Sequence, residues 1–194
     1  MLLRLIGKFI LWLYGWSYDI KIMSAIKKSV LIVAPHTSAW DLVFGKSVFE
    51  QEHVPVRFAI KKEAFFFPMN LFLRFLGGVP IDRFPDKSKQ RLSLVDAMVN
   101  TIRQEEKICM VITPEGSRST RKQWRTGFYY VALKAKVPIA LGYLDFKNKN
   151  AIIDTVLEPS GDVDKDMKFI MNYYRDKMSL GKHSKHAVLD ERWA

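Results

Sequence analysis

The chain has 194 residues, of which 48% are hydrophobic and 26% charged, a balance that suits one globular domain with its own core. Its single cysteine excludes an intramolecular disulfide and fits a reducing compartment. The net charge of +11 favours an anionic partner, which is nucleic acid, anionic lipid headgroups, a phosphorylated substrate or an acidic carrier protein. Solubility alone is the alternative explanation of this charge.

Residues 1–20 begin with a stretch that is apolar almost all round and rich in Trp and Tyr near its end. Arg4 and Lys8 interrupt it one helical turn apart. The uninterrupted apolar run is shorter than the roughly 20 residues that a transmembrane helix needs, and no small-residue cleavage site indicates a signal peptide. We therefore expect an amphipathic helix that lies in a membrane interface, with a core-packed first helix as the alternative.

Residues 29–34 form an apolar run that predicts a buried strand, and His36 and Asp41 follow directly after it. A strand that stops there, with a helix opening at Asp41, places both side chains at the carboxyl edge of the sheet, where open α/β sheets bind ligands. A carboxylate at that position can hold one imidazole nitrogen and leave the other free to accept a proton. The plain alternative is a histidine that caps the helix beside an ordinary aspartate.

Residues 61–76 contain two lysines, three consecutive phenylalanines, a proline and an apolar tail. Such a segment could line an acyl channel, dip into a bilayer surface or pack in the core, and its periodicity does not separate these.

Strand-like and helix-like segments alternate along the rest of the chain, which predicts an α/β fold. We expect a single domain with a mixed, mostly parallel central sheet flanked by helices. It comprises an N-terminal membrane-interface helix (1–20), a main domain (21–181) and a polar, poorly anchored C-terminal tail (182–194). The expected strands are 29–34, 56–60, 78–81, 108–113, 138–144 and 151–157, and the expected helices are 41–52, 88–106, 126–136 and 164–180.

Three further blocks follow along the chain: GGVPIDR at residues 77–83, TPEGSRS at 113–119 and VPI at 137–139. Together with His36 and Asp41, and in this order, they resemble the glycerolipid acyltransferase family, typified by 1-acylglycerol-3-phosphate acyltransferases. The resemblance spans residues 29–144. One departure is Pro35, which stands where an asparagine commonly precedes the histidine, and it puts substrate preference in doubt more than reaction type.

The resemblance implies that His36 is the general base for an acceptor hydroxyl and that Asp41 fixes the imidazole tautomer and stabilises its positive charge. The acceptor hydroxyl takes the place of a protein nucleophile, and no Gly-x-Ser-x-Gly motif is present. Arg83 is implied in binding the acceptor phosphate, with a surface ion pair to Asp82 or Asp86 as the alternative.

The resemblance also places the second block in acceptor binding, through Glu115, Gly116, Ser117 and Arg118. In this block Glu115 would hold a donor or an acceptor hydroxyl, or would instead form a buried pair with an arginine. Ser117 contacts an anion or simply forms a turn, and residues 137–139 shape the pocket wall.

These features predict a peripheral or monotopic O-acyltransferase at the cytoplasmic face of a membrane. It would move a fatty acyl group from acyl-CoA or acyl carrier protein to a lysophospholipid, foremost 1-acylglycerol-3-phosphate, giving phosphatidic acid. No metal is expected, since His, Cys and acidic residues lack metal-ligand spacing. We also expect no cofactor beyond the donor and no nucleic-acid partner. The alternatives are acylation of a phosphate-free lysolipid, such as an amino-acid-containing lipid, and a basic nucleic-acid-binding protein.

Overall fold

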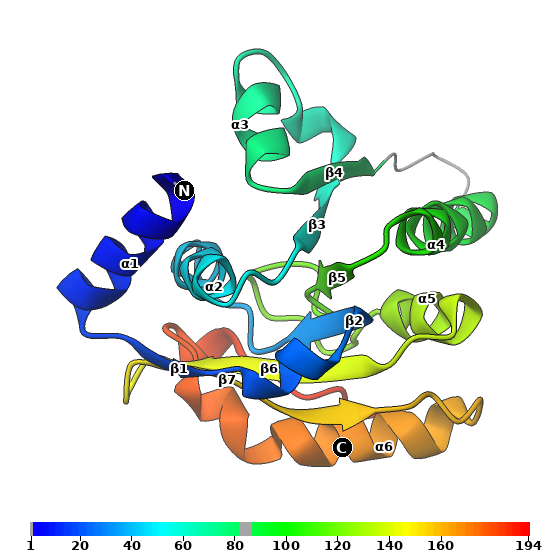
Figure 1. Ribbon diagram of the computed structural model, residues 1–194. Helices are drawn as coiled ribbons and strands as arrows, with labels where there is room; N and C mark the ends of the chain where they lie inside the picture. The colour runs from blue at the N-terminus through cyan, green and yellow to red at the C-terminus, as the bar shows by residue number, and fades with distance from the viewer. Residues whose placement is uncertain (1, 82–86) are drawn as a thin grey trace.

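A seven-stranded sheet forms the centre of the protein in the computed structural model, which describes residues 2–81 and 87–194 (Figure 1). The strand order is β1-β7-β6-β2-β5-β3-β4. The pairs among β6, β2, β5, β3 and β4 are parallel, β7 is antiparallel to β6, and β1 is parallel to β7. The strands are β1 (Ser17–Asp19), β2 (Lys28–Val33), β3 (Val56–Lys61), β4 (Gly78–Ile81), β5 (Ile108–Ile112), β6 (Ile139–Asp145) and β7 (Asn150–Leu157). The expected single α/β domain with a mostly parallel sheet is confirmed.

Helices cover both faces of this sheet (Figure 1). Within the described residues the α-helices are α1 (Leu2–Tyr14), α2 (Trp40–Gln51), α3 (Met69–Phe75), α4 (Lys87–Gln104), α5 (Gly127–Ala135) and α6 (Val163–Tyr174). Short 3-10 turns are η1 (Lys21–Ala25), η2 (Lys62–Ala64), η3 (Arg175–Leu180) and η4 (Ser184–His186). None of the helices in the described part of the chain has the length and apolar character to cross a membrane.

The central strand β2 sends alternate side chains to two separate cores, as the two-residue period of a strand requires. Val30 and Ile32 pack with α4, α5 and α6 on one face. Leu31 packs with α2 and with residues near the end of α1 on the other face. A strand buried on both faces reads as a continuous apolar run, which is why its position could be predicted.

The first 20 residues form more than the single N-terminal helix that we expected. Ser17–Asp19 forms the edge strand β1 beside β7, and Leu11 and Trp16 are buried in the core under α2. Most of the remaining α1 side chains are exposed, including Trp12 at 74%. One flank of α1 therefore packs on the domain while the other faces outward.

The phenylalanine-rich segment lies outside the core, because Phe66, Phe67, Phe72 and Phe75 are all exposed. It forms α3 and the turn before it, beyond the sheet edge made by β3 and β4 (Figure 1). This position excludes core packing for these four rings.

The C-terminal residues are better anchored than we expected. Asp190 is fully buried and accepts hydrogen bonds from the backbone N–H of Trp124 (2.7 Å) and from the guanidinium of Arg192 (2.6 Å). The indole N–H of Trp193 donates to Asp164 at the start of α6 (2.7 Å). The predicted loose tail at 182–194 is therefore wrong, because the buried Asp190 carboxylate and the Trp193 indole tie its end to the domain.

Candidate active site

Two loops meet at the carboxyl edge of the sheet because the strands before them, β2 and β5, are neighbours with Ile32 opposite Ile112. We call residues 34–41 the histidine loop and residues 113–126 the glutamate loop. Parallel pairing brings the ends of both strands to the same edge. Residues that lie almost eighty positions apart in the sequence thereby come into contact.

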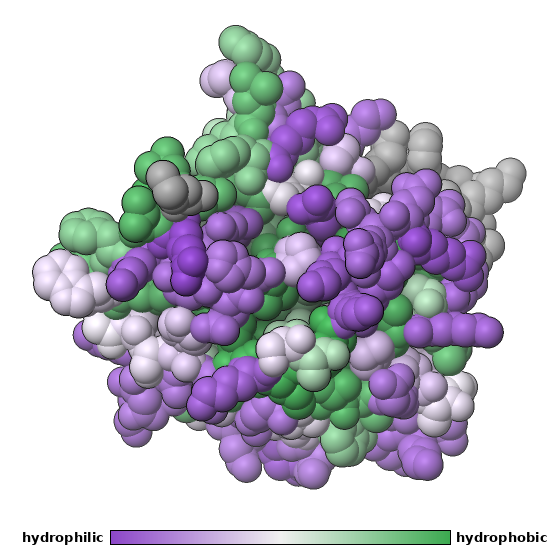
Figure 2. Space-filling view, in the orientation of Figure 1, coloured by the Kyte–Doolittle hydropathy of each residue, from purple (hydrophilic) through white to green (hydrophobic). Residues whose placement is uncertain are grey.

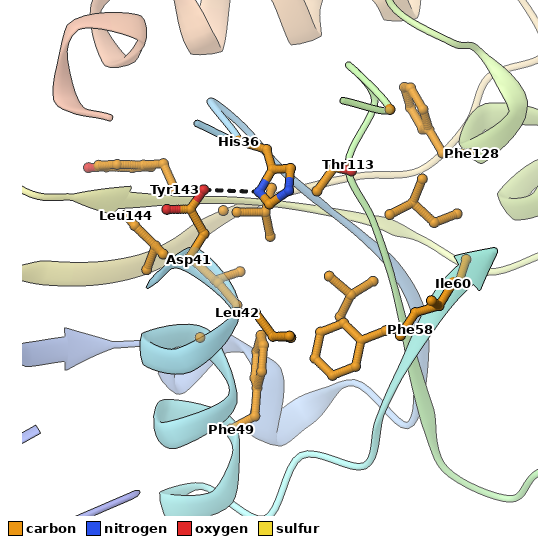
Figure 3. A pocket seen from close by; sticks show the side chains of 18 of the residues that line it. His36, Asp41, Leu42, Phe49, Phe58, Ile60, Thr113, Phe128, Tyr143 and Leu144 are labelled. Carbon is orange, nitrogen blue, oxygen red and sulfur yellow. Dashed lines mark hydrogen bonds and ion pairs between the residues drawn. The ribbon is translucent and has the colours of Figure 1, made fainter. Parts of the chain in front are cut away.

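His36 and Asp41 are hydrogen-bonded, with 2.9 Å between His36 Nδ1 and Asp41 Oδ2. An ionised carboxylate can only accept, so Nδ1 carries the proton and Nε2 keeps a free lone pair. The Asp41 side chain is buried, while that of His36 is 22% exposed. Figure 3 shows the imidazole edge that does not face Asp41 turned toward the cavity. This arrangement can hold the imidazole in one tautomer with one ring nitrogen free.

Asp41 is itself fixed by the backbone of the histidine loop. Its Oδ2 accepts the N–H groups of Thr37 (2.9 Å) and Ser38 (3.0 Å) in addition to His36 Nδ1. Three donors at one oxygen hold the carboxylate in one orientation. The other oxygen, Oδ1, is buried and has no hydrogen-bond partner among the described residues.

Glu115 supports the histidine loop from the glutamate loop. Its buried carboxylate accepts the backbone N–H of His36 at 2.7 Å. Burial raises the pKa of Glu115 to about 7, although this hydrogen bond opposes the rise. We expected a contact with a substrate hydroxyl or an ion pair with an arginine; the contact that the structure shows is with the main chain beside the imidazole.

A cavity of about 350 Å³ opens beside His36 and Asp41 (Figure 3). This volume lies within the range of small-molecule sites, about 300–1,000 Å³. Aliphatic and aromatic side chains make up most of its wall, from α2, β3, α4, β5, α5 and β6; examples are Leu42, Phe49, Phe58, Met98, Val111, Phe128 and Leu144. Such a wall suits a hydrocarbon chain whose polar end stays at the imidazole.

Gly116 and Arg125 form the polar rim of this cavity on the glutamate loop. Gly116 has a φ of +65°, and a Cβ there would lie 3.0 Å from Arg125 Nε. A side chain at this position is therefore disfavoured both by the backbone conformation and by the guanidinium packed against it. The glycine lets Arg125 lie close to the main chain beside the site.

Ser117 and Arg118, which the sequence predicted as binding residues beside Glu115 and Gly116, do not line the cavity. Arg118 is exposed and lies outside the cavity wall. Ser117 and Ser119 bond to each other, with 2.6 Å between their hydroxyl oxygens and a 3.0 Å bond from the Ser119 N–H to Ser117 Oγ. This favours the turn-forming alternative for Ser117. Arg83 lies outside the described residues, so its implied role stays a prediction.

The VPI block does not shape the pocket, which corrects our expectation. Val137 and Ile139 are buried where β6 begins, at the opposite edge of the sheet, and neither lines the cavity. Among the described residues, no group of three or more His, Cys, Asp or Glu side chains is arranged to hold a metal ion.

Arg125 is the residue that the sequence left out of the candidate site. The signal was present, because Arg125 belongs to a cluster with Arg118, Arg121 and Lys122 directly after Glu115. Which of the four cations lines the cavity depends on the course of the loop: the Arg125 N–H donates to the carbonyl of Pro114 at 2.8 Å, which folds the loop back on itself.

Comparison with known proteins agrees with this geometry. The family model described as Acyltransferase matches residues 19–140, from β1 to the start of β6, and so includes both loops. A search of curated proteins finds no match. Because the family model covers more than half of the chain, this enzyme belongs to the acyltransferase family.

Proposed function

We propose that this acyltransferase moves a fatty acyl group from an acyl thioester to the hydroxyl of a lysophospholipid, foremost 1-acylglycerol-3-phosphate, with His36 as the general base. The observation that carries the proposal is the 2.9 Å contact of His36 with Asp41 at the rim of an apolar cavity. The geometry supplies a base for a hydroxyl next to a space for a hydrocarbon chain.

In the proposed reaction His36 Nε2 takes the proton of the acceptor hydroxyl while its oxygen attacks the thioester carbonyl carbon. The tetrahedral intermediate then collapses, the C–S bond breaks, and the imidazolium returns its proton to the leaving thiolate. Asp41 stabilises the imidazolium and keeps the ring in place, and Glu115 holds the main chain of His36. No covalent acyl-enzyme is needed.

Arg125 supports a phosphorylated acceptor, because it brings a guanidinium to the cavity rim beside Gly116. A guanidinium grips phosphate through two parallel hydrogen bonds. Arg83, as implied by the resemblance, would add a second cation to the same phosphate. Together they favour an anionic acceptor over a neutral one.

The test is a thioester-release assay with acyl-CoA and acyl carrier protein as donors and a panel of lysolipids. We expect release that depends on the acceptor and is fastest with 1-acylglycerol-3-phosphate. Faster release with a phosphate-free lysolipid, such as an amino-acid-containing one, would favour that acceptor. The absence of release with every acceptor and donor would contradict the proposal.

We further propose that α1 and the α3 segment rest on a cytoplasmic membrane surface. Exposed apolar side chains cover both elements, and Figure 2 shows these two regions as the green patches at the upper left and top of this face. Examples are Leu5, Phe9 and Trp12 on α1, and Phe67, Leu71 and Phe72 in the α3 segment. Arg4 and Lys8 on α1 would meet anionic headgroups.

Binding to vesicles of anionic phospholipid tests this docking. Phe67→Ser with Phe72→Ser should weaken sedimentation with vesicles, since both rings are exposed. Phe169→Ser is the matched control, because Phe169 is an exposed phenylalanine on α6, away from both elements. Equal loss in all variants, or no loss in any, would contradict the docking.

A further inference from the structure

The stretch from Gly181 to His186, which we call the basic segment, packs against the histidine loop. A Cβ on Gly181 would lie 2.8 Å from Pro35 Cγ and 3.0 Å from Thr37 Oγ1, so the backbone at Gly181 lies close against these two side chains. The His183 N–H donates to Thr37 Oγ1 at 3.2 Å. Pro35 and Thr37 are the two neighbours of His36 in the sequence, so this segment packs against the part of the histidine loop that carries the imidazole.

The basic segment also contacts the residues on either side of this border. Lys182 Nζ lies 4.9 Å from the ring centroid of Trp40, within the range of a cation–π contact. His186 Nδ1 is 3.4 Å from the hydroxyl of Thr120 in the glutamate loop. The segment therefore bridges the outer sides of both loops that form the site.

Its position is fixed by the chain on both sides. Before it, the Phe146 N–H donates to the carbonyl of Leu180 at 3.0 Å. After it, buried Asp190 bonds the Trp124 N–H, one residue from Arg125. These contacts hold Lys182 and Lys185 beside the two loops that form the site.

Positive charge accumulates on the basic segment and on the neighbouring part of the glutamate loop. The basic segment and residues 116–126 of the glutamate loop contain no acidic residue. In the part of the chain that the structure describes, no carboxylate forms an ion pair with five exposed cations of these segments, Arg118, Arg121, Lys122, Lys182 and Lys185. Several like charges on two touching segments repel one another unless an anion joins them.

We propose that the basic segment binds the phosphate groups of coenzyme A, which rests on the proposed function because it assigns the donor of that reaction. If the acyl chain lies in the cavity and the thioester at His36, the carrier must leave through the mouth and run along the surface. An acceptor phosphate lies only a few bonds from the reacting hydroxyl, and Arg125 in the cavity rim already meets it. The cations outside the histidine loop are then left for the 3′-phosphate and diphosphate of the donor.

The test is the double variant Lys182→Glu with Lys185→Glu, assayed with acyl-CoA at a fixed acceptor concentration. We expect the KM for acyl-CoA to rise about 10-fold or more, since two charge-assisted contacts to phosphate become repulsive, with a much smaller change in kcat. Lys182→Arg with Lys185→Arg should restore the KM. Lys27→Glu with Lys107→Glu is the matched control, because these exposed lysines precede β2 and β5 at the opposite edge of the sheet.

Calorimetric binding of coenzyme A and dephospho-coenzyme A, without any acyl group, separates this inference from the proposed function. Coenzyme A should bind the wild type more tightly than dephospho-coenzyme A, and the Lys→Glu pair should remove that difference even if no acyl transfer is detected. An unchanged KM and unchanged binding in the variant would overturn the inference while leaving the reaction intact. A KM change confined to acyl carrier protein, or to the lysolipid, would also overturn it, because the cations would then serve a protein donor or the acceptor phosphate.

Discussion

The histidine loop and the glutamate loop leave neighbouring strands at the same edge of the sheet, yet they are built in opposite ways. The histidine loop is mostly buried, and Asp41 holds its imidazole and two of its backbone N–H groups. The glutamate loop is buried only near its ends, at Pro114, Glu115 and Trp124, and its middle carries exposed cations. The difference suggests that the histidine loop holds the reacting groups in place, while the glutamate loop binds the negative charge of the substrates.

Asp41→Asn should have the largest effect, because it acts on the fixed loop. A neutral amide cannot stabilise the imidazolium that forms when the acceptor is deprotonated. We expect kcat to fall about 10²–10⁴-fold, measured by thioester release at saturating substrates. A change of less than about threefold would mean that the carboxylate only shapes the loop.

Arg125→Ala should weaken binding of the acceptor and leave the proton-transfer step unchanged. Loss of a charge-assisted bond to phosphate is worth about 1.5–3 kcal/mol, so the KM for 1-acylglycerol-3-phosphate should rise roughly 10-fold or more. A phosphate-free acceptor serves as the control and should show little change. An equal rise in the KM for both acceptors would mean that Arg125 supports the structure of the loop and does not bind the phosphate.

Glu115→Gln tests the contact between the two loops through the pH dependence of stability. The folded pKa of about 7 lies above the ordinary value of 4.5, so between these values the unfolded chain releases a proton that the folded chain keeps. The wild type should therefore lose stability relative to the glutamine variant as the pH rises from about 4.5 to about 7, by about 3 kcal/mol at most. Urea unfolding at several pH values measures this, and parallel curves for both proteins would contradict it.

Arg118→Ala should have the smallest effect of the four. Arg118 is exposed and does not line the cavity, in contrast to Arg125 in the same loop. We expect the KM for the acceptor to change by less than about threefold. A change as large as that of Arg125→Ala would show that the middle of the glutamate loop turns toward the acceptor.

The same contrast explains how much of the molecule could be predicted from its sequence. Buried strands such as β2 and β5 contain apolar runs of four or five residues, so their positions were evident. The edge strand β1 was missed, because Ser17, Tyr18 and Asp19 are three partly exposed residues with no apolar pattern. The contact between His36 and Asp41 is local, so the spacing of the two residues was sufficient to suggest it.

The contacts that join distant segments could not be predicted in this way. Glu115 and His36 are 79 residues apart in the sequence, and their bond depends on β5 lying next to β2 in the sheet. The hydrogen bond from the Trp124 N–H to Asp190 depends on the chain returning past α6, and no local sequence pattern predicts that return. Because of this return, the basic segment lies against the histidine and glutamate loops rather than on a loose tail.

The most direct test of the account is the rate of acyl transfer by His36→Ala. This substitution removes the imidazole but keeps the backbone N–H that bonds to Glu115, so the melting temperature should change little. With His36 as the general base, the account predicts acceptor-dependent thioester release about 10²–10⁴-fold slower than in the wild type. Release at close to the wild-type rate by a folded His36→Ala protein would contradict it.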